Sequence, residues 1–125
     1  MSKLKAEVIK YSKKLNTTNL SALRSGNISI RTKENGVDGF YITPSGRKYS
    51  SLKINDIVFV SLKGVFDKKK GKPSSEWRFH KDIYVNKKDA KAIVHAHSTC
   101  ATAVSTHQKS IPAFHYMVAV AGGED

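Results

Sequence analysis

Cysteine is nearly absent from this sequence of 125 residues. Because Cys100 is the one cysteine, the chain cannot form an internal disulfide, which fits a reducing compartment. The sequence contains no run of about 18 apolar residues, so no membrane-spanning helix is expected. Its lysine-rich N-terminus also lacks the apolar stretch of a secretory signal peptide. These absences predict a cytoplasmic protein that has no membrane partner.

Acidic residues are scarce as well, with 10 Asp and Glu against 22 Lys and Arg, for a net charge of +12. A chain this basic could bind nucleic acid, an acidic membrane surface or a small anionic substrate. Most of the cations are lysines, which act as point charges rather than as bidentate readers of bases or phosphates. They are scattered apart from a cluster at 68–72, and arginine is not interleaved with aromatic residues as in single-strand binders.

We therefore favour a solvated lysine-rich surface and expect no nucleic-acid partner. A nucleic-acid-binding module remains the alternative from a different functional class. It would be revealed by RNA binding that weakens steeply as salt is added, because phosphate neutralisation releases counterions.

Low-complexity tracts and internal repeats are also missing, and a hydrophobic content of 39% fits one globular domain over residues 1–125. Apolar residues spaced by three and four predict a helix over 3–16. Two more helices are expected, over 75–85 and 98–107, each opened by serine or threonine. In the last of these, Cys100 is expected to be a small core residue.

Strand-like segments lie between these helices, over 28–31, 40–43, 57–62, 92–97 and 111–117. Ile28 and Ile30 alternate with polar residues, which predicts that the first strand is half-buried. Asn35-Gly36 predicts a hairpin turn after it. Several short strands in close succession favour an antiparallel sheet, and we expect an α+β fold in which helices flank that sheet.

Two histidines, His95 and His97, are separated by one residue in the segment over 92–97. Alternate side chains of a strand point to one face, so both imidazoles could reach the same point. Glu76 follows a serine pair that is a ready N-cap, which would place its carboxylate in the first turn of a helix. A carboxylate and two imidazoles suit Zn²⁺ or a similar divalent ion.

Two ordinary histidines are the commoner explanation of the His95 and His97 pair taken alone. His80 lies four residues after Glu76 and shares a helix face with it. This spacing is compatible with a further metal ligand or with a hydrogen bond from His80 to Glu76 or to the backbone, and both interpretations stay open.

Three short segments suit an anion such as a phosphate. Ser74-Ser75 offers hydroxyls beside the N–H groups of a helix start. Gly26-Asn27 offers backbone N–H groups and an amide side chain, and Ser45-Gly46 offers a hydroxyl and N–H groups in a tight turn. A plain helix start and plain turns are the alternatives.

Taken in chain order, five motifs resemble those of the class II aldolase/epimerase family: Gly26-Asn27-Ile28-Ser29, Ile42-Thr43-Pro44-Ser45-Gly46, Lys72-Pro73-Ser74-Ser75-Glu76, His95-Ala96-His97 and Ile111-Pro112-Ala113-Phe114-His115-Tyr116. The resemblance covers nearly the whole chain. It implies a three-layer domain with a largely antiparallel central sheet, incomplete at its C-terminal end. It also implies homotetramers with active sites at the subunit interfaces.

The resemblance further implies one divalent metal ion per subunit, Zn²⁺ or a similar ion, bound by Glu76, His95 and His97. Displaced from the metal by the substrate, Glu76 is also the expected catalytic base. Tyr116, with His115 beside it, is expected to act as an acid toward the aldehyde from a neighbouring subunit. The implied sugar-phosphate pocket consists of Gly26, Asn27, Ser45, Gly46, Ser74 and Ser75.

The implied reaction is cleavage of a ketose 1-phosphate such as L-fuculose 1-phosphate into dihydroxyacetone phosphate and an aldehyde such as lactaldehyde. A divalent ion would stabilise the enediolate that forms as the C–C bond breaks. The alternatives are an L-ribulose-5-phosphate 4-epimerase, in which aspartate replaces Glu76, a sugar-phosphate dehydratase of the same fold, and a non-catalytic remnant. The third metal histidine of the family is expected beyond Asp125, so the isolated chain should be poorly active.

Overall fold

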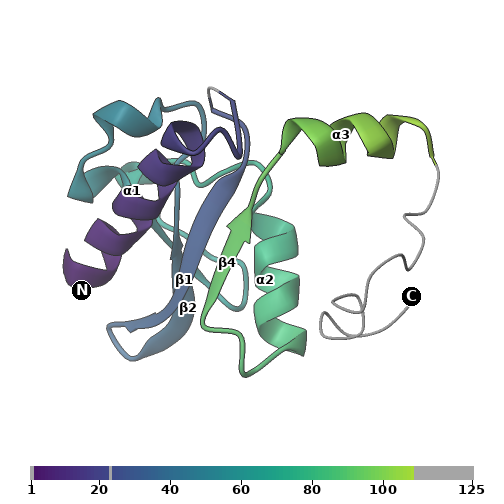
Figure 1. Ribbon diagram of the computed structural model, residues 1–125. Coiled ribbons are helices and arrows are strands. Elements are labelled where there is room, and N and C mark those ends of the chain that lie inside the picture. Colours follow the sequence, from purple (N-terminus) through teal and green to yellow (C-terminus); the bar gives the residue numbers. More distant parts are fainter. Residues whose placement is uncertain (1, 23, 109–125) are drawn as a thin grey trace.

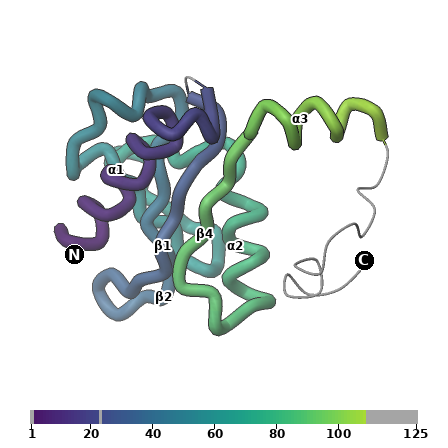
Figure 2. Tube along the Cα trace, in the orientation of Figure 1, coloured from purple at the N-terminus to yellow at the C-terminus, as the bar shows by residue number. Residues whose placement is uncertain are grey.

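The middle layer of the fold is a four-stranded antiparallel sheet with the strand order β3-β2-β1-β4. The computed structural model describes residues 2–22 and 24–108. The strands are β1 (Asn27–Glu34), β2 (Val37–Ile42), β3 (Val58–Ser61) and β4 (Ala92–His95). Helix α1 (Ser2–Thr17) covers one face and helix α2 (Trp77–Asn86) covers the other (Figures 1 and 2). The α+β fold expected from the sequence is therefore confirmed.

The α1 side of the sheet holds one apolar cluster. Val8 and Leu15 of α1 are buried against Ile28 of β1 and Tyr41 of β2. Fully burying a side chain the size of valine or leucine contributes about 1.5–3 kcal/mol, so this stripe of α1 fixes the helix on the sheet. The helix predicted over 3–16 is confirmed with one extra residue at each end.

The α2 side holds a second cluster, in which Phe40 and Val60 from the sheet pack with Tyr84 of α2. This face corrects one expectation about β1. The polar face of β1 was expected to be exposed, yet Ser29 is 0% exposed beneath α2. The serine is tolerated there because its hydroxyl has hydrogen-bond partners on the helix.

Helix α2 begins at Trp77, two residues later than predicted, and Glu76 is its N-cap rather than a residue of its first turn. The reason lies in the chain before it. The Ser45 N–H donates to the Lys72 carbonyl at 3.0 Å, and the Ser74 N–H donates to the Thr43 carbonyl at 2.9 Å. These bonds keep 72–74 extended beside 43–45, which brings two of the three predicted anion-binding segments together.

Helix α3 (Thr99–Thr106) follows β4 with Ser98 as its N-cap, as expected. Every residue of α3 is exposed, so the placement of Cys100 in the core was wrong: a small apolar side chain alone does not identify a buried position. The predicted strand over 92–97 ends at His95. The strand-like segment 111–117 lies outside the described residues. Among the described residues, no helix is long and apolar enough to span a membrane.

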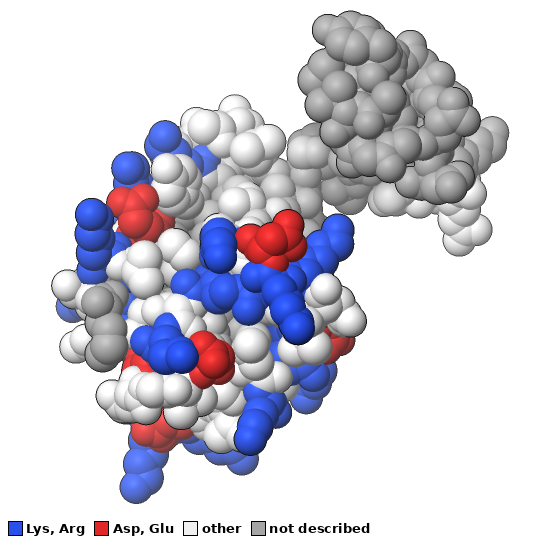
Figure 3. All heavy atoms as spheres, turned by 90° about the horizontal axis from the view of Figure 1, so that it is seen from below, with Lys and Arg blue, Asp and Glu red and all other residues white. Residues whose placement is uncertain are grey.

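Basic side chains are spread over the face of the molecule seen in Figure 3, with acidic side chains among them. Lys33 lies 3.3 Å from Asp38, and Lys70 lies 3.8 Å from Glu34. These pairs are exposed on the lysine side and contribute little to stability. The distribution is the one expected of a solvated lysine-rich surface.

Candidate metal and phosphate site

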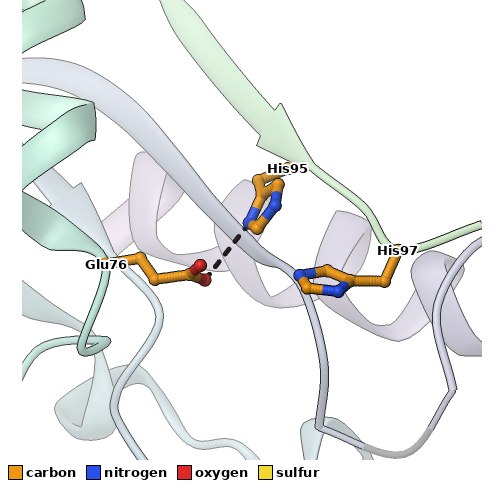
Figure 4. A group of neighbouring side chains, drawn as sticks. All are labelled: Glu76, His95 and His97. Carbon is orange, nitrogen blue, oxygen red and sulfur yellow. Dashed lines mark ion pairs between the residues drawn. The ribbon is translucent and has the colours of Figure 1, made fainter. Parts of the chain in front are cut away.

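Glu76, His95 and His97 converge at one edge of the sheet (Figure 4). Glu76 comes from the start of α2, His95 from the last residue of β4, and His97 from the segment that follows. One potential ligand atom from each residue lies within 4.8 Å of the others. The Nδ1 atom of His95 is 3.2 Å from Oε2 of Glu76, and the two imidazole centroids are 4.6 Å apart.

The donor set fits a divalent metal ion. His95 Nδ1 is buried and has no hydrogen-bond partner among the described residues, although the Glu76 carboxylate is close to it. A buried ring nitrogen left unpaired costs stability unless something else satisfies it. Two imidazoles and a carboxylate are the ligands that Zn²⁺ and similar ions take in proteins. Glu76, His95 and His97 would hold such an ion.

His80 is not part of this cluster. Its side chain is 0% exposed, with Nδ1 2.7 Å from Ser29 Oγ and Nε2 hydrogen-bonded to Asn27 Oδ1. Burial lowers the pKa of His80 to about 4, and nearby His95 contributes to that lowering. Of the two interpretations left open by the sequence, the structure supports the hydrogen-bonded histidine, although its partners are Ser29 and Asn27 rather than Glu76.

The loop before β1 holds the histidine segment in place. Gly26 has φ +77°, and a Cβ there would lie 2.5 Å from the His95 carbonyl oxygen and 2.9 Å from Ser21 Oγ. That same Ser21 Oγ accepts a hydrogen bond from the His97 N–H at 2.8 Å. The Tyr49 hydroxyl donates to the Gly26 carbonyl, and burial raises the pKa of this phenol. Only glycine fits this close approach.

A pocket of about 180 Å³ opens beside the metal-ligand cluster. Glu76 and His97 lie on its wall, so the two sites share residues. All six residues expected to bind the sugar phosphate line it: Gly26, Asn27, Ser45, Gly46, Ser74 and Ser75. The pocket is smaller than the roughly 300–1,000 Å³ typical of sites for drug-sized ligands, and its size suits a phosphoryl group with a few carbons.

Two arginines in this pocket were missed by the sequence reasoning. Arg24 and Arg47 line the pocket, and Arg24 Nη1 donates to the Gly46 carbonyl at 2.9 Å. Arginine binds phosphate in a bidentate manner and is the less common cation of this chain, so its placement close to Gly26 and Gly46 in the sequence was a usable signal. Arg47 also lies 3.7 Å from Asp56, which holds it at the surface.

Asn27 was expected to offer its amide to an anion, and the structure gives this side chain other partners. It is 1% exposed. Its Nδ2 donates to Glu76 Oε2 at 2.5 Å, and its Oδ1 is hydrogen-bonded to His80. The amide therefore serves the carboxylate of the metal cluster. Tyr116 and His115, the expected acid and its neighbour, lie outside the described residues.

Known proteins are similar to this chain over most of its length. The family described as the class II aldolase and adducin N-terminal domain matches residues 6–125. A 5-methylthioribulose-1-phosphate/5-deoxyribulose-1-phosphate aldolase of Rhodospirillum rubrum is 43% identical over 98% of this chain and 53% of its own. The L-fuculose phosphate aldolase of Escherichia coli K12 is 42% identical over 98% of this chain and 54% of its own.

Solved structures agree with these relatives. An L-fuculose 1-phosphate aldolase superimposes with a TM-score of 0.84 and 39% identity, over 96% of this chain and 56% of that one. The L-fuculose-1-phosphate aldolase of Thermus thermophilus has a TM-score of 0.74 and 28% identity, over 93% and 57%. The chain spans about half the length of the curated relatives that it matches. By sequence and by fold, the chain belongs to the class II aldolase/adducin N-terminal domain family.

Proposed function

We propose that this chain provides the metal-binding and phosphate-binding part of an aldolase that cleaves a ketose 1-phosphate into dihydroxyacetone phosphate and an aldehyde. One observation carries the proposal: the cluster of Glu76, His95 and His97 shares a wall with a small pocket lined by hydroxyls, glycines and two arginines. The reaction requires that the phosphate and the reacting carbon of the substrate be held side by side, and this arrangement offers a place for each.

The pocket is the proposed phosphate subsite. Arg24 and Arg47 supply positive charge, and Ser45, Ser74 and Ser75 line the wall with hydroxyl-bearing side chains. Hydrogen bonds to an ionised group contribute about 1.5–3 kcal/mol each, so a few of them bind a phosphate firmly. Holding the phosphate orients the rest of the substrate toward Glu76, which removes entropy from the reacting step.

Glu76 is the proposed general base. Its carboxylate is half-exposed at the pocket wall, where a substrate hydroxyl can reach it. A Zn²⁺ or similar ion bound at the cluster would stabilise the negative charge of the enediolate as a Lewis acid. The amide of Asn27 keeps one oxygen of Glu76 in place. Tyr116, contributed by a neighbouring subunit of a homotetramer, remains the proposed acid toward the aldehyde.

The proposed substrate class is a deoxyketose 1-phosphate. The relatives named above act on L-fuculose phosphate or on 5-substituted ribulose 1-phosphates by their names, and these substrates share the half that becomes dihydroxyacetone phosphate. We assign the pocket described here to the phosphate of that shared half. L-fuculose 1-phosphate, yielding lactaldehyde, and 5-deoxyribulose 1-phosphate are therefore the first substrates to test. Glu76, where epimerases of the family carry aspartate, favours the aldolase over the epimerase.

The decisive experiment joins this chain to the downstream half of the Escherichia coli relative and measures release of dihydroxyacetone phosphate. We expect turnover that requires a divalent ion, with Glu76→Gln as the inactive control. The 125-residue chain, which spans about half the length of the relatives, is assayed alone for comparison. Turnover that persists in Glu76→Gln would contradict the assignment of the base. Interconversion of pentulose 5-phosphates without cleavage would instead support the epimerase.

A further inference from the structure

Four polar side chains lie fully buried between β1 and α2, behind the metal cluster. Ser29 and His80 are 0% exposed, and Asn27 and Tyr84 are 1% exposed. Burying a polar group without a partner costs about 1–3 kcal/mol, so four of them in one layer call for an explanation. They are joined to one another and, through Asn27, to Glu76.

The spacing of these residues explains how they meet. Asn27 and Ser29 are two apart on β1, so their side chains project from the same face of the strand. Glu76, His80 and Tyr84 are four apart at the start of α2 and along it, so they lie on one side of the helix. The two sets interleave as a ladder in the order Glu76, Asn27, His80, Ser29 and Tyr84.

The direction of each hydrogen bond in this ladder follows from the acceptor at its end. An ionised carboxylate only accepts, so the amide of Asn27 donates through Nδ2 to Glu76 Oε2 at 2.5 Å. Its Oδ1 then faces His80 Nε2 and accepts from it. His80 therefore carries its proton on Nε2.

The same logic continues to the far end. Burial lowers the pKa of His80 to about 4, so the ring is neutral at pH 7 and its Nδ1 is an acceptor. Ser29 Oγ, 2.7 Å away, must donate to it, and the Tyr84 hydroxyl, 2.8 Å from Ser29 Oγ, must donate to Ser29. Burial raises the pKa of Tyr84 to about 12, which keeps this donor protonated. In every hydrogen bond of the ladder, the donor therefore lies farther from Glu76 along the ladder than the acceptor does.

We propose that His80 and Ser29 are positioning residues that fix the amide of Asn27 with its donor on Glu76, and thereby hold Glu76 as a metal ligand. The proposal rests on the proposed metal-dependent function of Glu76. If the His80 proton moved to Nδ1, the lone pair of Nε2 would face Asn27 Oδ1 and repel it. A flip of the Asn27 amide would relieve this repulsion, but it would place Oδ1 against the carboxylate of Glu76. The direction of the hydrogen bond between Ser29 and His80 thus determines which atom of the Asn27 amide faces Glu76.

The test measures Zn²⁺ affinity of the 125-residue chain, with Zn²⁺ alone as the probe. His80→Phe keeps an aromatic ring beside Phe40 and Phe79, which contact His80, but removes both ring nitrogens. We expect its Zn²⁺ dissociation constant to rise about 10- to 100-fold, the usual loss when the outer partner of a metal ligand is removed. His80→Gln restores an amide donor toward Asn27 and should recover most of the affinity. His107→Phe, at an exposed histidine, is the matched control.

Two further measurements keep the test decisive if His80→Phe folds poorly. Nitrogen-15 spectra of the wild-type imidazoles at pH 7 should show His80 protonated on Nε2, and Ser29→Ala should introduce the Nδ1-protonated form and weaken Zn²⁺ binding. A wild-type His80 protonated on Nδ1 would overturn the proposal. Wild-type Zn²⁺ affinity in Ser29→Ala, or a loss in His80→Phe that His80→Gln does not recover, would overturn it as well.

The aldolase proposal can be refuted independently of the proposed role of the ladder. In the enzyme completed with the downstream half, His80→Phe should lower kcat while the KM for the ketose phosphate stays within about threefold, because the phosphate pocket is intact. If the completed enzyme cleaves no ketose phosphate while the Zn²⁺ affinities of the variants change as expected, the proposed reaction is refuted and the proposed role of the ladder is supported. If the enzyme is active and the Zn²⁺ affinities of the His80→Phe and Ser29→Ala variants equal that of the wild type, only the proposed role of the ladder is refuted.

Discussion

Comparison of Gly26→Ala with Gly36→Ala should separate the cost of the backbone conformation at Gly26 from the cost of its close approach to the His95 carbonyl oxygen. Gly26 has φ +77°, where an alanine costs about 1–2 kcal/mol. Its added Cβ would also lie 2.5 Å from the His95 carbonyl oxygen and 2.9 Å from Ser21 Oγ. Overpacking of this kind costs about 1–3 kcal/mol. We expect the free energy of unfolding to fall by about 2–5 kcal/mol in total.

Gly36→Ala is the matched control. Gly36 sits in the β1–β2 turn at φ +79°, and a Cβ there would meet no atom within 4 Å. It should therefore incur only the backbone cost of about 1–2 kcal/mol. Urea unfolding of both variants gives the difference, which isolates the contact with His95. Because that contact moves the carbonyl of a metal-cluster residue, Gly26→Ala should also weaken Zn²⁺ binding, whereas Gly36→Ala should not.

Equal losses of stability in Gly26→Ala and Gly36→Ala, with equal Zn²⁺ affinity, would refute this reasoning. The loop before β1 would then be able to move away from the histidine segment without consequence.

Three further predictions concern the cluster, the pocket and His80. His95→Ala should lower the Zn²⁺ retained after dialysis, measured by elemental analysis, because the cluster loses one of its two imidazoles; retention equal to wild type would remove His95 from the site. Ser75→Ala should weaken binding of inorganic phosphate by about 1.5–3 kcal/mol by calorimetry, with Zn²⁺ content unchanged, and Ser50→Ala outside this pocket should not. The pKa of His80 is lowered from 6.5 to about 4 in the folded chain, so the unfolded chain binds the proton first as pH falls. Stability should therefore be full above pH 6.5 and fall by roughly 3 kcal/mol as pH drops toward 4, a slope that acid denaturation of His80→Phe should lack.

Local patterns in the sequence were sufficient for most of the fold. Helix α1 was predictable because Leu4, Val8 and Leu15 form one apolar stripe, and the hairpin was predictable because Asn35 and Gly36 adopt positive φ. The convergence of Glu76, His95 and His97 was also predictable, since an alternating pair of histidines and a carboxylate are a small, recognisable donor set. These signals involve residues that are near one another in the chain or share one chemistry.

The remaining features depend on distant partners. Ser29 looked like a solvent-facing residue because its partners, His80 and Tyr84, are 51 and 55 positions away. The two-residue delay of α2 has the same origin, because the Ser74 backbone is bonded to Thr43. No periodicity within a segment reports such pairings, so sequence reasoning gave Asn27 to the anion and missed its role beside Glu76.

The register between β1 and β4 links the two halves of the site. Asn27 pairs with His95, and Ser29 pairs with Ile93. A slip of one residue would turn every side chain of one strand to the opposite face, so either Asn27 would leave Glu76 or His95 would leave the cluster. The strand pairing that builds the sheet therefore also aligns His95 with the buried side chains of Asn27 and Ser29. A sheet that forms in the correct register has, by the same step, set Asn27 opposite His95.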